Sequence, residues 1–196
     1  MNDYEEIWDK RLNIHTMGRN DANADEYRYP YEPTAYKVLE RLAQSGVIGK
    51  DNVVLDYGCG KGRVDFFLSG QTGARTIGIE YDEQIYQKAA ENQKTASAKA
   101  SFVLGRAEEY EVPPEVDRCY FFNPFSVEIL HKVMARILES YYQQPREIYL
   151  FFYYPSDDYV GCLMTMNEPE FFDEIDCSDL FEGNDPRERI MIFSLS

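Results

Sequence analysis

The stretch VVLDYGCGKGR at residues 53–63 decides the fold of this chain. It begins as a short apolar run, passes through Asp56 into a cluster of glycines, and leads into apolar residues at helical spacing. A strand that turns through glycines into a helix lets backbone N–H groups approach a ligand at the N-terminus of that helix. The dinucleotide pattern G-x-G-x-x-G requires glycine where Arg63 stands, and a phosphate-binding loop requires Ser or Thr where Gly62 stands. The loop therefore belongs to neither class.

The same alternation of apolar runs and amphipathic segments continues along the chain. Thr34, Asp82 and Ser126 are predicted to be helix N-caps, and the first of these helices should end at Gly46. The predicted strands are 53–55, 76–80, 102–104, 116–122, 148–153, 171–175 and 190–193. Short, fully apolar runs between amphipathic helices are typical of a parallel sheet that is covered on both faces.

The last two predicted strands differ from the others, because only a turn region at 183–186 and no long helix separates them. This arrangement favours an antiparallel hairpin at a sheet edge. The sequence therefore predicts one doubly wound α/β domain over residues 34–196, with a mostly parallel seven-stranded sheet and a C-terminal antiparallel hairpin. Residues 1–33 are predicted to form an irregular, aromatic-rich lid segment that precedes the domain.

The charge balance narrows the possible partners. The 196 residues include 20 Lys and Arg against 35 Asp and Glu, for a net charge of −15. Such a balance argues against nucleic acid as a partner, because phosphate recognition depends on clustered basic side chains. Residues 157–188 hold eleven carboxylates against Arg187 alone. An acidic field of this kind attracts cationic groups such as an amine or a basic protein segment, although an acidic surface that serves solubility is the alternative.

Location and metal content can also be predicted. No apolar run approaches the ~18 residues of a membrane span, and the first residues are acidic where a secretory signal is basic. We therefore expect a cytoplasmic protein without a membrane partner. The four cysteines are far apart in the sequence and none stands at ligand spacing from a histidine, so we expect neither a metal site nor a disulfide framework.

An acidic residue closes the second predicted strand. Glu80 stands 22 positions after Gly58, and in a doubly wound sheet a carboxylate at this place can accept hydrogen bonds from both ribose hydroxyls of a nucleoside. A solvated carboxylate at a strand end is the alternative for Glu80 alone. The glycine loop and the acid together favour a nucleoside site.

With these residues identified, the segment 53–62 resembles the first motif of class I S-adenosylmethionine-dependent methyltransferases, in which an acidic residue, one further residue and G-x-G-x-G follow one another. The resemblance extends over about residues 34–196 and implies a Rossmann-like fold with S-adenosyl-L-methionine as the cofactor. It implies that Asp56 lies near the methionine amino group, that Glu80 holds the ribose and that Tyr81 lies against adenine. The residues that would shape the methionine and ribose pocket are Gly58, Cys59, Gly60 and Gly62.

After the third strand, many members of this family carry Gly-Asp-Ala, in which the Asp binds the adenine amino group. Here the run is GRAE at 105–108, with Arg106 at the expected acid. Ala107 and Glu108 are therefore the expected cofactor contacts, with Glu108 as the substitute acid.

The segment FFNPF at 121–125 resembles the Asp/Asn-Pro-Pro-aromatic motif of amino-methyltransferases, with Phe125 in place of the second proline. The resemblance implies that Asn123 and the Pro124 carbonyl accept hydrogen bonds from a target amine and that Phe125 stacks on the substrate. Such contacts would aim the nitrogen lone pair at the methyl group. A strand-end turn in which Asn and Pro serve the backbone geometry is the alternative.

Several family members place a lid over the cofactor where this chain has the aromatic-rich stretch 27–36. Tyr31, Thr34 and Tyr36 are therefore possible contacts to cofactor or substrate, and packing of their side chains on the sheet is the alternative.

The sequence predicts S-adenosylmethionine-dependent methyl transfer to a nitrogen, in an acceptor that is a protein or a small molecule rather than nucleic acid. The alternative is a catalytically silent relative that binds the cofactor as a sensor or partner subunit.

Overall fold

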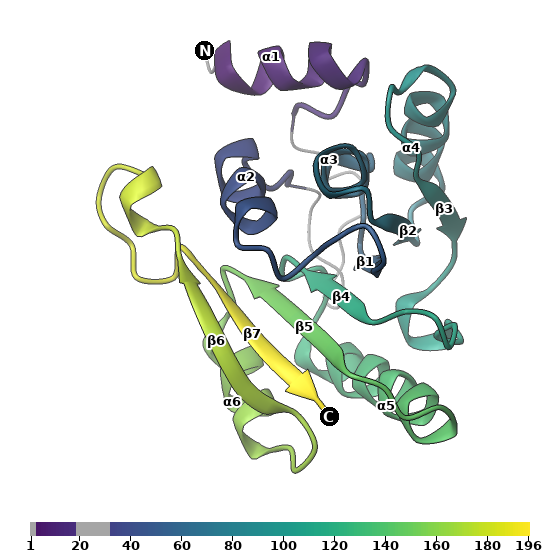
Figure 1. Ribbon diagram of the computed structural model, residues 1–196, viewed down its shortest axis with the longest axis vertical. Coiled ribbons are helices and arrows are strands. Elements are labelled where there is room, and N and C mark those ends of the chain that lie inside the picture. Colours follow the sequence, from purple (N-terminus) through teal and green to yellow (C-terminus); the bar gives the residue numbers. More distant parts are fainter. Residues whose placement is uncertain (1–2, 19–31) are drawn as a thin grey trace.

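A computed structural model describes residues 3–18 and 32–196, and a single seven-stranded sheet runs through this part of the chain (Figure 1). The strand order is β3-β2-β1-β4-β5-β7-β6. The strands are β1 (Val53–Tyr57), β2 (Arg75–Glu80), β3 (Ser101–Leu104), β4 (Arg118–Phe121), β5 (Ile148–Tyr153), β6 (Glu170–Asp176) and β7 (Arg189–Leu195). Strands β1 to β5 pair in parallel, whereas β7 pairs antiparallel with both β5 and β6. The predicted fold class is therefore confirmed, including the closing hairpin.

Helices cover both faces of the sheet. They are α1 (Asp3–Leu12), α2 (Tyr36–Gln44), α3 (Arg63–Thr72), α4 (Glu83–Thr95), α5 (Val127–Gln143) and α6 (Asp157–Thr165), with short 3-10 turns η1 (Ala107–Glu109) and η2 (Ser178–Leu180). The first three helices share one apolar core with Val54 and Tyr120. Helices α5 and α6 form a second core with Leu55 and Phe121 on the opposite face (Figure 1). No helix of the described residues is long and apolar enough to cross a membrane.

The alternation of side chains along the strands explains these two cores, because neighbouring residues of a strand point to opposite faces. Tyr57, Phe121 and Phe152 occupy partner positions on β1, β4 and β5. Their rings stack in one row, with centroids 4.7 Å apart between Tyr57 and Phe121 and 4.6 Å apart between Phe121 and Phe152. This row fixes the register of the three strands whose carboxyl ends form the centre of the site.

Two helices were not predicted. Helix α1 forms where an irregular segment was expected, and its residues Trp8 and Leu12, four positions apart, are buried in the core with Phe67. Such spacing places both side chains on one helix face. Helix α6 lies between β5 and β6, capped by the Ser156 hydroxyl, which accepts a hydrogen bond from the Tyr159 N–H.

The predicted N-caps have three different outcomes. Asp82 caps α4, since its carboxylate accepts hydrogen bonds from the backbone N–H groups of Gln84 and Ile85. Ser126 occupies the N-cap position of α5 without a side-chain cap bond. The prediction for Thr34 is wrong, because Ala35 is the N-cap of α2 and the Tyr36 N–H donates instead to Glu5 of α1 at 3.1 Å.

Candidate active site

A cavity of about 500 Å³ opens at the carboxyl ends of β1, β2, β4 and β5. Ligands of doubly wound sheets bind at this edge. The residues predicted from the sequence that lie on its wall are Thr34, Asp56, Gly58, Cys59, Glu80, Tyr81, Ala107, Glu108, Asn123, Pro124 and Phe125. Gly60 and Gly62 belong to the same loop but are not part of the wall, and Tyr31 lies outside the described residues.

The glycine loop holds the first and second strands together. The backbone N–H groups of Gly58 and Cys59 both donate to the Ile79 carbonyl, at 2.9 and 3.0 Å. Gly58 has a φ of 75°, and a Cβ at this position would lie 2.5 Å from the Pro124 Cβ. Only glycine allows the loop to approach so closely, so the two motifs found in the sequence touch each other at Gly58 and Pro124.

Gly62 has a packing role rather than a place in the cavity. It precedes α3 with a φ of 84°, and a Cβ here would lie 2.5 Å from the Phe102 ring. Gly60 acts through its backbone N–H, which donates to the Glu80 carboxylate at 3.0 Å. The role of these two glycines in shaping the pocket stays a prediction, since Gly62 contacts Phe102 and Gly60 contacts the Glu80 carboxylate.

Glu80 is a buried carboxylate at the end of β2 on the cavity wall, with 5% of its surface exposed. One oxygen accepts from the Gly60 N–H and the other from the Asp82 N–H at 2.9 Å. Burial raises the pKa of Glu80 to about 7, and the backbone N–H bonds oppose this shift. Because a carboxylate has about four lone-pair sites, each oxygen keeps capacity for a ligand hydroxyl.

Asp56, next to the end of β1, is also buried, at 3% exposed, and also lies on the wall. Its Oδ2 has no hydrogen-bond partner among the described residues. Burial raises the pKa of Asp56 to about 7, and burial also raises the pKa of the neighbouring carboxyl Asp65 well above its usual range. An orphaned acceptor of this kind fits a ligand ammonium group, which would satisfy the oxygen and favour its ionised form.

The β2 end of the cavity has the composition predicted for an adenine site. Half-buried Tyr81 directly follows Glu80, and Ala107 and Glu108 of η1 line the opposite side with Gly105. Arg106 is exposed, forms an ion pair with Glu109 at 3.7 Å and does not line the cavity. Glu108, and not Arg106, is therefore the charged residue of this segment that lines the cavity.

Asn123, after the end of β4, has a φ of 40°, a conformation that non-glycine residues adopt at a cost and that often marks functional sites. Its side-chain N–H donates to the Tyr154 carbonyl, and its oxygen accepts from the Ser156 N–H at 3.2 Å. The oxygen keeps one lone pair for a substrate. Phe125 is only 4% exposed and packs edge-on against Phe121, so most of its ring belongs to the core.

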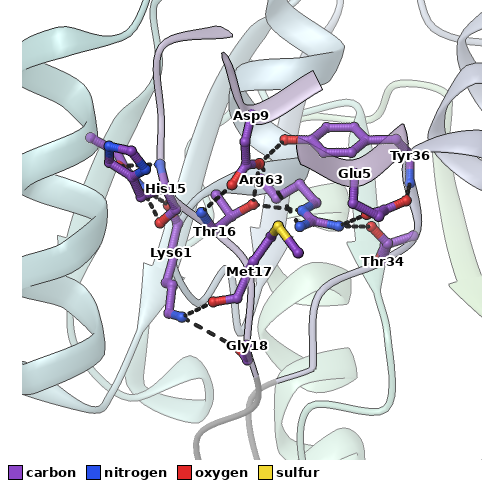
Figure 2. Close-up of polar contacts among 11 residues, drawn as sticks. Glu5, Asp9, His15, Thr16, Met17, Gly18, Thr34, Tyr36, Lys61 and Arg63 are labelled. Atoms are coloured by element: carbon purple, nitrogen blue, oxygen red, sulfur yellow. Dashed lines mark hydrogen bonds and ion pairs between the residues drawn. The ribbon is translucent and has the colours of Figure 1, made fainter. Parts of the chain in front are cut away.

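Buried polar side chains connect the N-terminal helix with the cavity wall, as Figure 2 shows. Arg63 lines the cavity and donates to Glu5, to the Thr16 hydroxyl at 2.7 Å and to the Thr34 carbonyl at 3.2 Å. Asp9 accepts hydrogen bonds from the hydroxyls of Thr16 and Tyr36, at 2.7 and 2.6 Å. Tyr36 is fully buried and does not line the cavity, so the packing alternative applies to it.

Several wall residues were not predicted. They are Arg63, Ile85, Tyr120, Phe122, Tyr153, Tyr154, Phe181 and Glu188. Tyr153 is the last residue of a predicted parallel strand, and Tyr154 follows it. The reasoning that identified Asn123 at a strand end could therefore have identified these two tyrosines as well. No local sequence pattern could have identified Glu188 as a wall residue, because its position depends on β7 running antiparallel to β5. Within the described residues, no group of three or more His, Cys, Asp or Glu side chains is placed to hold a metal ion.

Comparison with known proteins agrees with this geometry. The family described as "Methyltransferase domain" matches residues 54–143. A protein-lysine N-methyltransferase of Saccharolobus islandicus is 31% identical over 86 residues, which cover 42% of this chain and 53% of that protein. The chain thus spans about half the length of this curated relative.

Two solved structures illustrate the fold. A TehB-like S-adenosylmethionine-dependent methyltransferase from Corynebacterium glutamicum matches with a TM-score of 0.58 and 17% identity, covering 89% of this chain and 91% of that one. An RNA methyltransferase from Salinibacter ruber in complex with S-adenosyl-L-homocysteine matches with a TM-score of 0.53 and 20% identity, covering 84% and 92%. At these identities the similarity establishes the fold alone.

Proposed function

We propose that the chain is a class I S-adenosylmethionine-dependent methyltransferase and that it transfers the methyl group of S-adenosyl-L-methionine to a nitrogen of a protein or small amine. The observation that carries this proposal is one cavity that joins the buried Glu80 at the end of β2 to Asn123 and Pro124 at the end of β4. Such a cavity has room for a nucleoside at one end and an acceptor at the other.

The proposed cofactor residues fit the chemistry of the group they would hold. When bound, S-adenosylmethionine supplies a methyl group on a positively charged sulfur. Glu80 would accept hydrogen bonds from the ribose hydroxyls with the lone pairs that its two backbone partners leave free. Asp56 would receive the amino group at its orphaned oxygen, and Tyr81 with Ile85 would cover the adenine ring together with Ala107 and Glu108.

The Asn123-Pro124 segment would position the acceptor. The remaining lone pair of the Asn123 oxygen and the Pro124 carbonyl would accept hydrogen bonds from the target N–H groups, which leaves the nitrogen lone pair pointing away from them. An amine that arrives protonated must first lose a proton to solvent. Positioning of this kind can supply much of the rate of a transfer between two bound groups.

A nitrogen in a protein or small amine is favoured over nucleic acid for two reasons. The curated relative is named as a protein-lysine N-methyltransferase, and the net charge of −15 repels phosphate backbones. The alternative of a catalytically silent cofactor-binding protein is not favoured, because the cavity continues beyond the predicted cofactor residues to Asn123 and Tyr154.

We also propose that residues 1–33 cover the cofactor and that residues 34–196 form the catalytic domain. The support for this division is that Glu5 and Thr16 bind Arg63 on the cavity wall (Figure 2). Tyr31 keeps its proposed role as a contact from this cover.

Calorimetry tests the cofactor assignment. We expect S-adenosylmethionine and S-adenosylhomocysteine to bind and NAD not to bind, because Arg63 replaces the third glycine of the dinucleotide pattern. Transfer of a labelled methyl group should then be measured with lysine peptides and with RNA as acceptors. Tighter binding of NAD would overturn the cofactor assignment, and labelling of RNA alone would overturn the proposed acceptor.

A further inference from the structure

One end of the cavity is formed by side chains that belong to none of the family motifs found in the sequence. Tyr153 ends β5 and Tyr154 follows it, Glu188 precedes β7, and Phe181 belongs to the connection between β6 and β7. Because β7 runs antiparallel to β5, its beginning lies beside the end of β5, with Tyr153 opposite Ile190 and the Tyr154 N–H donating to the Arg189 carbonyl at 2.9 Å. We refer to Tyr153, Tyr154, Phe181 and Glu188 as the β5–β7 pocket.

Hydrogen bonds and ring contacts hold this pocket in shape. The Tyr153 hydroxyl donates to the Glu188 carboxylate at 2.6 Å, and the Tyr154 hydroxyl donates to Asp185 at 2.7 Å. The Tyr153 ring lies 4.7 Å from the Phe122 ring and 6.2 Å from the Tyr154 ring, measured between centroids. Tyr154 has a φ of 49°, and its carbonyl accepts the side-chain N–H of Asn123. The pocket is therefore joined directly to the residue proposed to position the acceptor.

Within the part of the chain that the structure describes, no ion pair with Lys, Arg or His neutralises the Glu188 carboxylate of this pocket. Arg187 pairs with Asp185 at 2.9 Å and lies over the Tyr154 ring at 4.7 Å, and Arg189 pairs with Glu174 at 3.1 Å. Lys37 lies over the Phe181 ring at 3.7 Å, so these cations contact the rings of the pocket or other carboxylates and not Glu188. Glu188 is thus a half-buried carboxylate on the wall of a cavity, and the Tyr153 hydroxyl is its only side-chain hydrogen-bond partner among the described residues.

A carboxylate in a cavity that aromatic rings also line is complementary to a cation on an alkyl chain. The rings attract the charge through their quadrupoles and cover the apolar methylene groups, while the carboxylate accepts a charge-assisted hydrogen bond. An anionic or neutral polar group would gain neither contribution. The other ten carboxylates of residues 157–188 add negative charge to the same C-terminal region of the chain.

We infer that the β5–β7 pocket binds the protonated alkyl amine of the methyl acceptor, of which the lysine side chain is the type, and directs it toward Asn123. This inference rests on the proposed methyl transfer and deepens it by naming the acceptor class and the residues that recognise it. Glu188 is the residue on which the recognition of charge depends, and the tyrosines recognise the alkyl chain.

The test uses the full chain saturated with S-adenosylhomocysteine and three probes. These are a short peptide with one lysine among neutral residues, the same peptide with acetyl-lysine, and 1,5-diaminopentane. NMR titration should give at least tenfold tighter binding of the lysine peptide than of the acetyl-lysine peptide, with shifts at the amides of Tyr154 and Glu188. A preference for the peptide over the diamine identifies a protein as the source of the amine, and the reverse identifies a small molecule.

Matched variants separate the pocket from the general acidity of the hairpin. Glu188→Gln keeps an acceptor for the Tyr153 hydroxyl and should weaken binding of the lysine peptide at least tenfold. Glu182→Gln removes the same charge from an exposed position of the same connection, outside the cavity, and should change the affinity less than twofold. Tyr153→Phe, which keeps the ring and releases Glu188, should weaken binding at least threefold.

Equal binding of the two peptides, or equal effects of Glu188→Gln and Glu182→Gln, would overturn the inference. If the proposed function itself is wrong, the result is different: calorimetry should then detect no binding of S-adenosylhomocysteine to the unmodified protein. The discrimination between lysine and acetyl-lysine can still be measured in that case.

Discussion

The two ends of the cavity are built from different kinds of contact. At the β2 end, Glu80 is held by backbone N–H groups of Gly60 and Asp82, close to it in the sequence or in the adjoining loop. At the β7 end, particular side chains make bonds across more than thirty residues, since the Asn123 amide donates to the Tyr154 carbonyl and the Tyr153 hydroxyl donates to the Glu188 carboxylate. The first end is fixed by the path of the backbone, and the second by the identities of particular side chains.

This difference is consistent with the cofactor binding at one end of the cavity and the methyl acceptor binding at the other. A site that depends on backbone N–H groups and glycines tolerates changes of other side chains, because it is built from atoms that every residue has. A site made of Asn123, Tyr153, Tyr154 and Glu188 changes its chemistry with each substitution. We therefore expect changes at the two ends to have separable effects, with the β2 end governing the cofactor and the β7 end governing transfer.

The largest expected effect is at Asn123. Asn123→Ala should lower the rate of methyl transfer about 100-fold, equivalent to about 2.7 kcal/mol, because it removes an acceptor contact and releases Tyr154 and Ser156. The affinity for S-adenosylhomocysteine, measured by calorimetry, should stay within about threefold, or about 0.7 kcal/mol.

Asn184→Ala is the matched control for this change. Asn184 also has a positive φ, of 49°, but is exposed and lies outside the cavity, so the cost of alanine in this conformation is similar and the rate should be unchanged. Full turnover by Asn123→Ala would mean that the Asn-Pro-Phe segment is only a strand-end turn. The proposal of nitrogen as the target would then fail while the family assignment stands.

A smaller effect is expected at the opposite end. Glu80→Ala should lower the affinity for S-adenosylhomocysteine about 30-fold or more, because two hydrogen bonds to a charged acceptor contribute about 2–4 kcal/mol together. Glu83→Ala, at an exposed position of the first turn of α4, provides the control. Circular dichroism should establish that both variants are folded. A loss of less than threefold in folded Glu80→Ala would place the cofactor elsewhere.

The same contrast explains which parts of the molecule could be predicted from the sequence. The glycine loop, Glu80 and the hairpin were recognisable because their signals are local, as turn residues and apolar runs with fixed spacing. Helix α1 was missed because its apolar face is short and its stability comes from Trp8 packing with Phe67 and from Glu5 bound to Arg63. Glu188 could not be assigned, because its place beside Tyr153 depends on the pairing of β5 with β7.

The third prediction concerns pH and applies to the β2 end alone. Because burial raises the pKa values of Asp56 and Glu80 to about 7, both carboxyls lose their charge as the pH falls below 7. The affinity for S-adenosylhomocysteine should therefore fall about tenfold for each titrating group between pH 8 and pH 6. The free energy of unfolding of the unliganded protein should change in the opposite sense. It should decrease as the pH rises from about 4 to 7, because the folded state binds these protons more tightly.

The Asp56→Asn variant removes one of the two titrating carboxyls, so the pH dependence that is left reports on Glu80. Its affinity at pH 8 should be lower than that of the unmodified protein, and its dependence on pH should be shallower. Calorimetry at five pH values, in buffers of equal ionic strength, measures both quantities. An affinity that does not change with pH would show that neither carboxylate meets the cofactor.

The smallest expected effect is at Thr34, which lies between the two ends. Its hydroxyl pairs with the buried Tyr120 hydroxyl at 3.0 Å, although the residue also lines the cavity. Thr34→Val should lower the free energy of unfolding by about 1–2 kcal/mol, because the Tyr120 hydroxyl is left without this partner. The affinity for S-adenosylhomocysteine should change less than threefold.

Tyr120→Phe completes a double-mutant cycle with Thr34→Val, followed by urea unfolding and calorimetry. If the two hydroxyls bond mainly to each other, the double variant should be at least as stable as either single variant, because it leaves no unpaired hydroxyl. Additive losses of stability would mean that each hydroxyl has a separate partner. A loss of cofactor affinity beyond tenfold in Thr34→Val alone, with Tyr120→Phe unaffected, would instead make the Thr34 hydroxyl a direct cofactor contact. The N-terminal side of the cavity would then belong with Glu80 to the cofactor end.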